Sequence, residues 1–255
     1  MNMIREYIKY IRKAQGRYQI HSPYVFDFVN VCLKKKLPTQ ATKKIRKLKN
    51  FLLHSDEIIH IIDNGAGSKK LGNARSIKKM YQTSSTKGKY LELLYKISNH
   101  YQPNNCLELG THLGCASASL ALGNEKTNLI TIEGCEQTFK NAVYNFERLN
   151  ITNIAPLNCT FDEFLNSYKN EAFDLIYIDG DHRGKALKDY IEKLAPWTHD
   201  ETLIIIDDIR WSEDMFLAWV ELTSSNKFHL SMDLFKFGIL VPKKGKEKEH
   251  FTIRI

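Results

Sequence analysis

Residues that could bind a charged ligand gather first in the stretch 106–117. A short apolar segment leads into a turn containing Gly110 and Gly114, and the apolar run 116–122 follows as a predicted helix. Glycines let a backbone approach a ligand closely, and the N–H groups at the start of a helix attract polar groups. Because Glu108 lies two residues before Gly110, this turn would repel a diphosphate and attract a sulfonium or an amino group.

A second set of reactive side chains follows two later predicted strands. Asp179 and His182 come directly after one strand, and Asp207 with Asp208 comes after the next. If these strands are neighbours, their carboxylates meet in one crevice, where repulsion requires a cation or a proton between them. Oxygen ligands select a hard ion such as Mg²⁺. The structural alternative is that the acid pair caps a helix while Asp181 pairs with a basic side chain.

Two further strand ends carry residues suited to a nucleoside. Glu133 lies 23 residues after Gly110, where an acid can accept hydrogen bonds from ribose hydroxyls. Thr160 and Phe161 follow the next predicted strand.

These motifs resemble those of class I S-adenosylmethionine (SAM) dependent methyltransferases, whose first motif has the form acid-x-Gly-x-x-x-Gly. The dinucleotide fingerprint, G-x-G-x-x-G, is different. The resemblance implies SAM as the cofactor. The residues it implies for SAM binding are Glu108, Gly110, Thr111, His112, Gly114, Glu133, Thr160, Phe161 and Asp179. By the same resemblance, Thr160 would contact the adenine amine and Phe161 would cover the adenine ring.

Within this class, the later strand ends are similar to those of metal-dependent O-methyltransferases. The similarity is to the catechol and caffeoyl-CoA type, and more closely to the macrolide-sugar type, in which D-x-x-H is paired with a later D-D. Over about residues 83–241 it implies that Asp179, Asp207 and Asp208 hold Mg²⁺. His182 would then be the general base, since imidazole titrates near neutral pH. The catechol type has an asparagine in place of Asp208 and a lysine in place of His182, which favours the sugar-like group.

A regular alternation of strands and helices would position these residues. Strands are predicted at 105–109, 128–132, 153–158, 173–178 and 202–206, each followed by a helix, and then at about 228–232 and 236–241. The alternation predicts an α/β fold, a Rossmann-like doubly wound and mostly parallel sheet with ligands at the carboxyl ends of its strands. The last two strands lie too close together for a crossover helix and predict a C-terminal antiparallel hairpin.

The N-terminal part lacks this alternation. We predict a helical basic cap over residues 1–85, with helices at 2–14, 24–33 and 39–53, and a SAM-binding methyltransferase domain over 86–255. Residues 1–50 hold thirteen basic and two acidic side chains, a net charge of +11, whereas the whole chain carries +8. This asymmetry favours an anionic partner, although basic residues at helical spacing also form ordinary solvated faces. The glycine loop from Asp63 to Ser68 is predicted to face the substrate.

Composition narrows the protein class. Hydrophobic residues make up 43% and charged residues 26% of the chain, which is typical of a soluble globular protein. No apolar run approaches the ~20 residues needed to cross a bilayer, and residues 1–17 do not read as a signal peptide. The five cysteines are odd in number and lack C-x-x-C spacing, so we expect a reducing cytoplasm rather than disulfides or zinc.

The sequence therefore predicts a SAM-dependent methyltransferase that O-methylates a small hydroxylated substrate with the help of Mg²⁺. One alternative is a 2′-O-ribose methyltransferase of RNA, with the basic cap gripping phosphates. Base N-methylation is disfavoured, because the place of its N/D-P-P-Y/F tetrad reads Asp-Gly-Asp-His over residues 179–182. The other alternative is a non-catalytic SAM-binding module. We expect a small molecule rather than nucleic acid as partner, and leave a homo-oligomer open.

Overall fold

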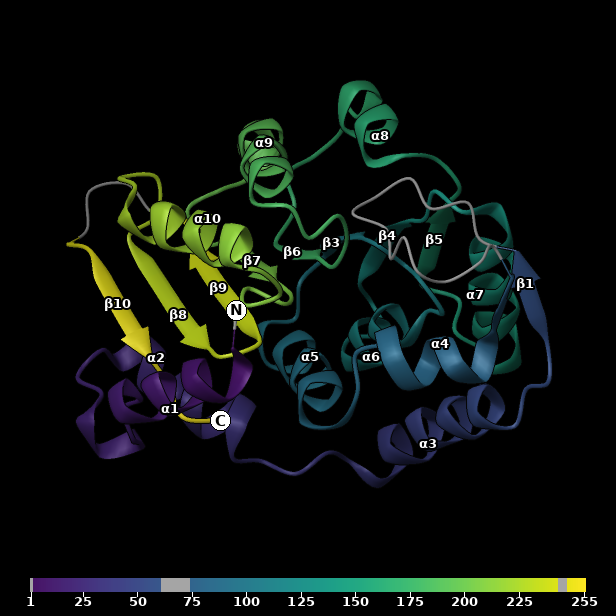
Figure 1. Ribbon diagram of the computed structural model, residues 1–255, viewed down its shortest axis with the longest axis horizontal. Helices are drawn as coiled ribbons and strands as arrows, with labels where there is room; N and C mark the ends of the chain where they lie inside the picture. The colour runs from purple at the N-terminus through teal and green to yellow at the C-terminus, as the bar shows by residue number, and fades with distance from the viewer. Residues whose placement is uncertain (1, 61–73, 243–246) are drawn as a thin grey trace. The chain divides into compact units, whose positions relative to one another are not determined.

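A computed structural model describes residues 2–60, 74–242 and 247–255 (Figure 1). Its contacts divide the chain into two compact units. The terminal unit joins Met1–Leu33 to Tyr168–Ile255, and the middle unit is the continuous segment Lys34–Ser167. Each unit is described separately below.

The middle unit is built on three parallel strands in the order β3 (Asn105–Leu109), β4 (Asn128–Ile132) and β5 (Ile154–Leu157). Its helices are α3 (Thr39–Leu53), α4 (Ile77–Ser84), α5 (Gly88–Tyr101), α6 (Cys115–Gly123), α7 (Glu136–Arg148) and α8 (Phe161–Ser167). Helix α5 packs along α6, and α3 contacts both α4 and α6. A small antiparallel pair, β1 (Ile58–His60) with β2 (Ala74–Ser76), completes the unit.

Helix α6 is buried along nearly its whole length because its sequence, CASASLALG, is small and apolar on every side. The small residues let α5 approach closely. A Cβ added at Gly123 would lie 2.5 Å from the carbonyl oxygen of Tyr95 in α5. At the start of α6, a Cβ on Gly114 would lie 2.5 Å from the ring of Phe146 in α7. The packing of α6 therefore fixes the position of the glycine turn that precedes it.

The terminal unit contains five strands in the order β10-β8-β9-β7-β6. They are β6 (Leu175–Ile178), β7 (Leu203–Ile206), β8 (Leu230–Leu234), β9 (Phe237–Val241) and β10 (Glu249–Thr252). Strands β6 and β7 are parallel, β9 is antiparallel to both β7 and β8, and β10 runs parallel to β8. The sequences of β6 and β7, LIYI and LIII, are wholly buried, as expected for parallel strands covered on both faces.

Helices α9 (Gly184–Leu194) and α10 (Glu213–Ser224) of this unit pack against each other (Figure 1). A short 3₁₀ segment, Ala195–Trp197, follows α9, and another, Arg17–Gln19, follows α1 (Met3–Lys13). Helix α2 (Pro23–Phe28) continues into a π-helical turn, Val29–Leu33. The buried Tyr10 of α1 donates a hydrogen bond to the carbonyl of Ile253, and its ring lies 5.2 Å from that of Phe235.

The strands confirm the predicted α/β fold with mostly parallel strands and a C-terminal antiparallel hairpin. All seven predicted strands are present, with ends within two residues of the expected ones. The prediction missed β10, the β1–β2 pair and α4. These elements are short or polar, so they carry little of the periodic apolar pattern on which the prediction depends.

The described residues among the first 85, 2–60 and 74–85, are mostly helical, as predicted, but also contain β1 and β2. Contacts place residues up to Leu33 in the terminal unit and α3 and α4 in the middle unit, so the basic segment 1–50 is shared by the two. The predicted domain boundary at residue 85 stays a prediction. The predicted glycine loop, Asp63 to Ser68, lies outside the described residues. Among the described helices, none is both long and apolar enough to cross a membrane.

Candidate active site

The predicted cofactor turn lies at the carboxyl end of β3. Gly110 and Gly114 have φ angles of 109° and 78°, and His112 between them has a φ of 49°. The backbone N–H groups of Gly110 and Thr111 both donate to the carbonyl of Ile132 at the end of β4. The glycines are thus required by the backbone conformation, and the turn is tied to the neighbouring strand.

Glu108 is fully buried beneath this turn. The hydroxyls of Ser117 and Thr131 both donate to its Oε2, the latter at 2.5 Å. Its Oε1 has no hydrogen-bond partner among the described residues. Burial raises the pKa of Glu108 to about 8, although the two hydroxyls act in the opposite direction. A buried acceptor of this kind is costly unless a donor reaches it, so Glu108 suits a ligand that brings a proton or a positive charge.

Glu133, at the end of β4, holds the turn through both oxygens. Its Oε2 accepts from the backbone N–H of His112 and its Oε1 from that of Cys135, each at 2.9 Å. The imidazole of His112 lies 3.2 Å from the hydroxyl of Ser85, and burial lowers the pKa of His112 to about 4, with a smaller effect from Arg75. His112 therefore lies in this turn as a neutral ring at physiological pH.

Thr160 and Phe161 lie at the start of α8. The backbone N–H of Thr160 donates to the carboxylate of Glu163 at 2.7 Å, and the hydroxyl of Thr160 accepts from the N–H of Glu163 at 3.2 Å. This reciprocal pattern is a capping box, which stabilises the first turn of a helix. Thr160 thus has a structural role that the sequence interpretation did not consider. Its predicted contact with adenine, like that of Phe161, stays a prediction.

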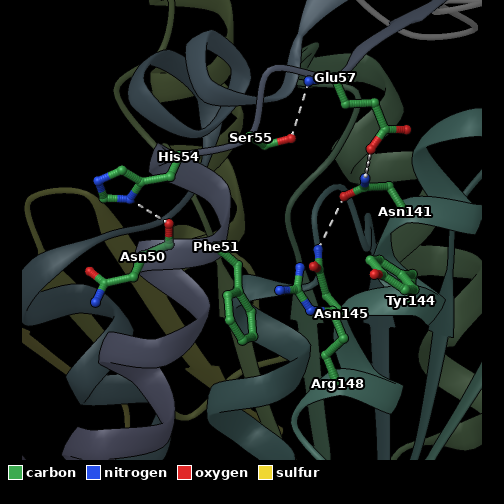
Figure 2. A pocket seen from close by; sticks show the side chains of 9 residues that line it. All are labelled: Asn50, Phe51, His54, Ser55, Glu57, Asn141, Tyr144, Asn145 and Arg148. Atoms are coloured by element: carbon green, nitrogen blue, oxygen red, sulfur yellow. Dashed lines mark hydrogen bonds between the residues drawn. The ribbon is translucent and has the colours of Figure 1, made fainter.

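A cavity of about 270 Å³ lies elsewhere in the middle unit, between α3 and α7 (Figure 2). Its lining residues are Asn50, Phe51, His54, Ser55, Glu57, Asn141, Tyr144, Asn145 and Arg148. The guanidinium of Arg148 stacks on the ring of Phe51 at 3.5 Å, and the amide of Asn141 lies 3.4 Å from Glu57. None of the predicted site residues lines this cavity, but the amide of Asn145, one of its lining residues, donates to the carbonyl of Leu113 in the glycine turn at 3.2 Å.

In the terminal unit, the ends of β6 and β7 are neighbours, as the sequence predicted. Ile178 and Ile206 are paired in the parallel register, and the N–H of Asp207 donates to the carbonyl of Ile178 at 2.9 Å. Asp179 and Asp207, each one residue further on, are therefore brought together. The hydroxyl of the buried Tyr177 donates to Asp207 at 2.7 Å and lies 3.2 Å from Asp179.

A lysine lies against the acid pair. The Nζ of Lys236, in the β8–β9 turn, is 2.5 Å from Asp207 Oδ1 and 3.4 Å from Asp208 Oδ1. Burial alone would lower the pKa of Lys236, but the three carboxylates of Asp207, Asp208 and Asp179 raise it to about 12. Burial and the charge of Asp207 raise the pKa of Asp208 above its ordinary value. The single ammonium of Lys236 therefore does not fully offset the negative charge of Asp207 and Asp208.

His182 lies beside Asp179, with Nε2 3.9 Å from Oδ1. Its ring centroid is 5.5 Å from that of Trp211, which is 64% exposed. Asp181 instead pairs with Arg183 at 2.5 Å and accepts from the hydroxyl of Tyr190. Asp181 thus pairs with a basic side chain, as the structural alternative predicted. His182 lies near Asp179 instead.

Backbone strain marks these strand ends. Asp181 and Asp208 have φ angles of 47° and 51°, and Phe235, next to Lys236, has one of 71°. L-residues rarely adopt such angles, and they concentrate at ligand and catalytic sites. The two aspartates and His112 of the glycine turn are half of the six described non-glycine residues with positive φ.

The sequence interpretation missed three residues of this site: Tyr177, Trp211 and Lys236. Tyr177 is the one residue with a hydrogen-bonding side chain in β6, and Trp211 lies three residues after the acid pair. A lone polar residue in an apolar strand and a tryptophan close to an acid pair are both visible in the sequence. Lys236 carried none, because a lysine in a hairpin turn is ordinary. Among the described residues, no group of three or more acidic, histidine or cysteine side chains is arranged to hold a metal ion.

The comparisons agree with this reading of the fold. Residues 107–209 match a family model described as a methyltransferase domain. No curated protein matches the chain.

Solved structures resemble the chain over most of their length. SAH-bound methyltransferase PaMTH1 of Podospora anserina matches with a TM-score of 0.60 and 12% identity, over 88% of this chain and 97% of that one. The SAH complex of a Bacillus cereus O-methyltransferase matches with a TM-score of 0.56 and 18% identity, over 87% of this chain and 97% of that one. TomG of Streptomyces achromogenes, an O-methyltransferase solved with SAM, matches with a TM-score of 0.57 and 13% identity, over 90% of this chain and 99% of that one. At these identities the likeness is one of fold.

Residues 107–209 are thus similar to a methyltransferase domain, and the fold is the one seen in solved SAM-dependent methyltransferases. Both findings agree with the resemblance to class I SAM-dependent methyltransferases that the sequence carries.

Proposed function

We propose that this protein transfers the methyl group of SAM to a hydroxyl oxygen of a small molecule. The observation that carries the proposal is the group at the ends of β6 and β7. There an imidazole, His182, lies between the carboxylate of Asp179 and the exposed ring of Trp211. A base beside a flat apolar surface suits a hydroxyl carried on an aromatic ring or a sugar.

For the cofactor, the residues of the glycine turn fit SAM. The unpartnered Oε1 of Glu108 supplies a buried acceptor, and the positive φ of Gly110 leaves the turn without a Cβ at that point. The carboxylate of Glu133, which accepts from two N–H groups of the turn, is the proposed acceptor for the ribose hydroxyls. Thr111, His112, Gly114, Thr160, Phe161 and Asp179 complete the proposed set. When bound, SAM supplies the methyl group from its sulfonium.

His182 is the proposed general base. With Nε2 turned to Asp179, its Nδ1 would take the proton of the substrate hydroxyl, and the oxygen could then accept the methyl group that bound SAM would supply. Asp179 orients the imidazole and stabilises it once it is protonated. Trp211 packs against the substrate and keeps water away from the hydroxyl. The rate gain from positioning the two reactants is the main contribution of the protein.

The predicted Mg²⁺ site fits less well. Three carboxylates, Asp179, Asp207 and Asp208, are chemically suited to Mg²⁺. Their arrangement is not suited to the ion, because the ammonium of Lys236 lies against Asp207 and Asp208. We therefore derive no step through a metal ion, and the Mg²⁺ set stays a prediction. Full turnover in excess EDTA would exclude it.

The test has two stages. Calorimetry with S-adenosylhomocysteine checks the cofactor, and a panel of catechols, sugars and nucleosides with methyl-labelled SAM then finds a substrate. His182→Ala should lower the rate by about 10²–10⁴-fold and leave the affinity for S-adenosylhomocysteine unchanged. His199→Ala is the matched control, since His199 also pairs with an aspartate, Asp174, but lies at the surface away from the acid pair. Equal rates for the two variants would refute the role of His182.

A further inference from the structure

The β8–β9 turn holds the Lys236 side chain rigidly beside the acid pair. The turn consists of two residues, and Phe235 takes a φ of 71° that a bulky side chain rarely adopts. Such a conformation persists only where surrounding contacts enforce it. Here the carbonyl of Phe235 accepts from Arg210 Nη1 at 2.8 Å, and the carbonyl of Lys236 accepts from the N–H of Ile209 at 3.1 Å.

A buried ion pair fixes the turn further. Arg210 donates to Asp233 through both terminal nitrogens, at 2.8 and 2.5 Å, and both side chains are less than 8% exposed. Asp233 in turn accepts from the N–H of Phe235 at 2.9 Å. Bidentate pairs of this kind set geometry as well as charge. Lys236 is therefore positioned by the fold and is not a mobile surface lysine.

The acceptor side is equally well defined. Asp207 is completely buried and accepts hydrogen bonds on both oxygens. The hydroxyl of Tyr177 donates to Oδ2, and the backbone N–H of Asp208 and the ammonium of Lys236 both donate to Oδ1. A carboxylate offers about four lone-pair positions. These donors thus occupy most of the lone-pair positions of the Asp207 carboxylate.

We propose that the Lys236 ammonium takes the place of a divalent cation at the Asp207–Asp208 pair. A Mg²⁺ ion demands oxygen ligands at about 2.0–2.1 Å and near-octahedral geometry. An ion bound to both carboxylates would lie against the ammonium, which is 2.5 Å from one and 3.4 Å from the other. Two cations cannot share this position, because their repulsion is strong where water is excluded. The charge that this site needs is supplied by the chain itself.

This inference deepens the proposed function. If the methyl transfer takes place as proposed, it proceeds without a divalent ion, and Lys236 is a positioning residue that holds Asp207 and Asp208 beside His182. That consequence rests on the proposed function. The occupancy of the acid pair does not, so it is tested by metal binding alone.

The experiment titrates Mn²⁺ into the full-length protein and follows free Mn²⁺ by electron paramagnetic resonance. The wild-type protein should show no saturable site at millimolar Mn²⁺. Lys236→Met, which keeps an unbranched side chain as far as Cε and removes the ammonium, should bind Mn²⁺ at least about tenfold more tightly than wild type. Adding Asp208→Asn to that variant should abolish the gain. Lys188→Met is the matched control, because Lys188 pairs with the exposed Glu221 at 2.7 Å, and it should behave as wild type.

Two results would overturn the proposal. The first is a wild-type protein that binds Mn²⁺ as tightly as Lys236→Met, in a way that Asp208→Asn removes. The second is a Lys236→Met protein with an unchanged circular dichroism spectrum and no gain in Mn²⁺ binding. If Lys236→Met does not fold, the wild-type titration decides alone: a saturable site lost in Asp208→Asn contradicts the proposal, and no saturable site supports it. Failure to bind S-adenosylhomocysteine would refute the proposed function without touching this result.

Discussion

Replacing Glu108 with glutamine should remove a pH dependence of stability that its buried carboxyl creates. Burial raises the pKa of Glu108 from 4.5 to about 8. The folded protein therefore keeps a proton that the unfolded chain releases above pH 4.5. This contribution to stability is complete below pH 4.5 and is lost as the pH rises through 8. Glutamine mimics the protonated carboxyl and can still accept from Ser117 and Thr131, so it should not show this loss.

The interval from pH 6.5 to 8.0 isolates the effect. His112 acts in the opposite direction, because burial lowers its pKa from 6.5 to about 4. Its contribution is lost as the pH falls through 4 and is complete above 6.5. Each pH unit between the two pKa values of Glu108 is worth about 1.4 kcal/mol. Wild type should therefore lose about 2 kcal/mol more than Glu108→Gln over this interval.

Thermal unfolding at the two pH values and equal ionic strength measures this difference. For a chain of this size, about 2 kcal/mol corresponds to a relative shift of about 4–8 °C in Tm. Glu136→Gln is the matched control, because Glu136 is exposed and its pKa is lowered by Lys140. It should follow wild type. The reasoning is refuted if Glu108→Gln loses as much stability as wild type, since Glu108 would then already be ionised in the folded protein at pH 6.5.

Three further substitutions test packing, charge and cofactor binding. Gly238→Ala should lower the free energy of unfolding by about 1–3 kcal/mol, measured in urea, because the new Cβ would lie 2.5 Å from the ring of Trp219. Arg210→Met should lower it by about 3–5 kcal/mol, since it leaves the carboxylate of Asp233 buried without its partner. Glu133→Gln should weaken S-adenosylhomocysteine binding by about 1–3 kcal/mol in calorimetry, because charge-assisted hydrogen bonds to the ribose are lost.

The two stability substitutions have matched controls, and each of the three has an outcome that would contradict it. Gly16→Ala should cost little, because its nearest atom, Oε1 of Gln19, lies at 3.7 Å; equal losses at the two glycines would contradict the packing argument. Lys140→Met breaks an exposed pair and should change stability by less than about 0.5 kcal/mol. A similarly small effect of Arg210→Met would show that its pair is not what stabilises the turn. Unaltered affinity in Glu133→Gln would remove Glu133 from the cofactor site.

The sequence was sufficient for the strands and for the order of their carboxyl ends. Apolar runs such as 202–206 are long and uninterrupted enough to be recognised as strands, and short crossovers make β6 and β7 parallel neighbours. That adjacency brings Asp179 and Asp207 together, so their proximity could be predicted. Acid-x-Gly-x-x-x-Gly likewise predicted the glycine turn, in which Gly110 takes a positive φ. These features depend on contacts between residues close in sequence or on the general rules of parallel sheets.

Only the tertiary structure decided what surrounds those carboxylates. Tyr177 reaches Asp207 from 30 residues away and Lys236 from 29, and neither pairing has a periodic signal. Lys236 reaches the acid pair because a two-residue turn, a strained Phe235 and a buried Arg210 together fix its direction. Such positions follow from packing of side chains that no local pattern encodes. The sequence by itself thus determined that two strands bring carboxylates together. The fold determined that a lysine lies against Asp207 and Asp208, because the packing of side chains decides which charge reaches a buried oxygen.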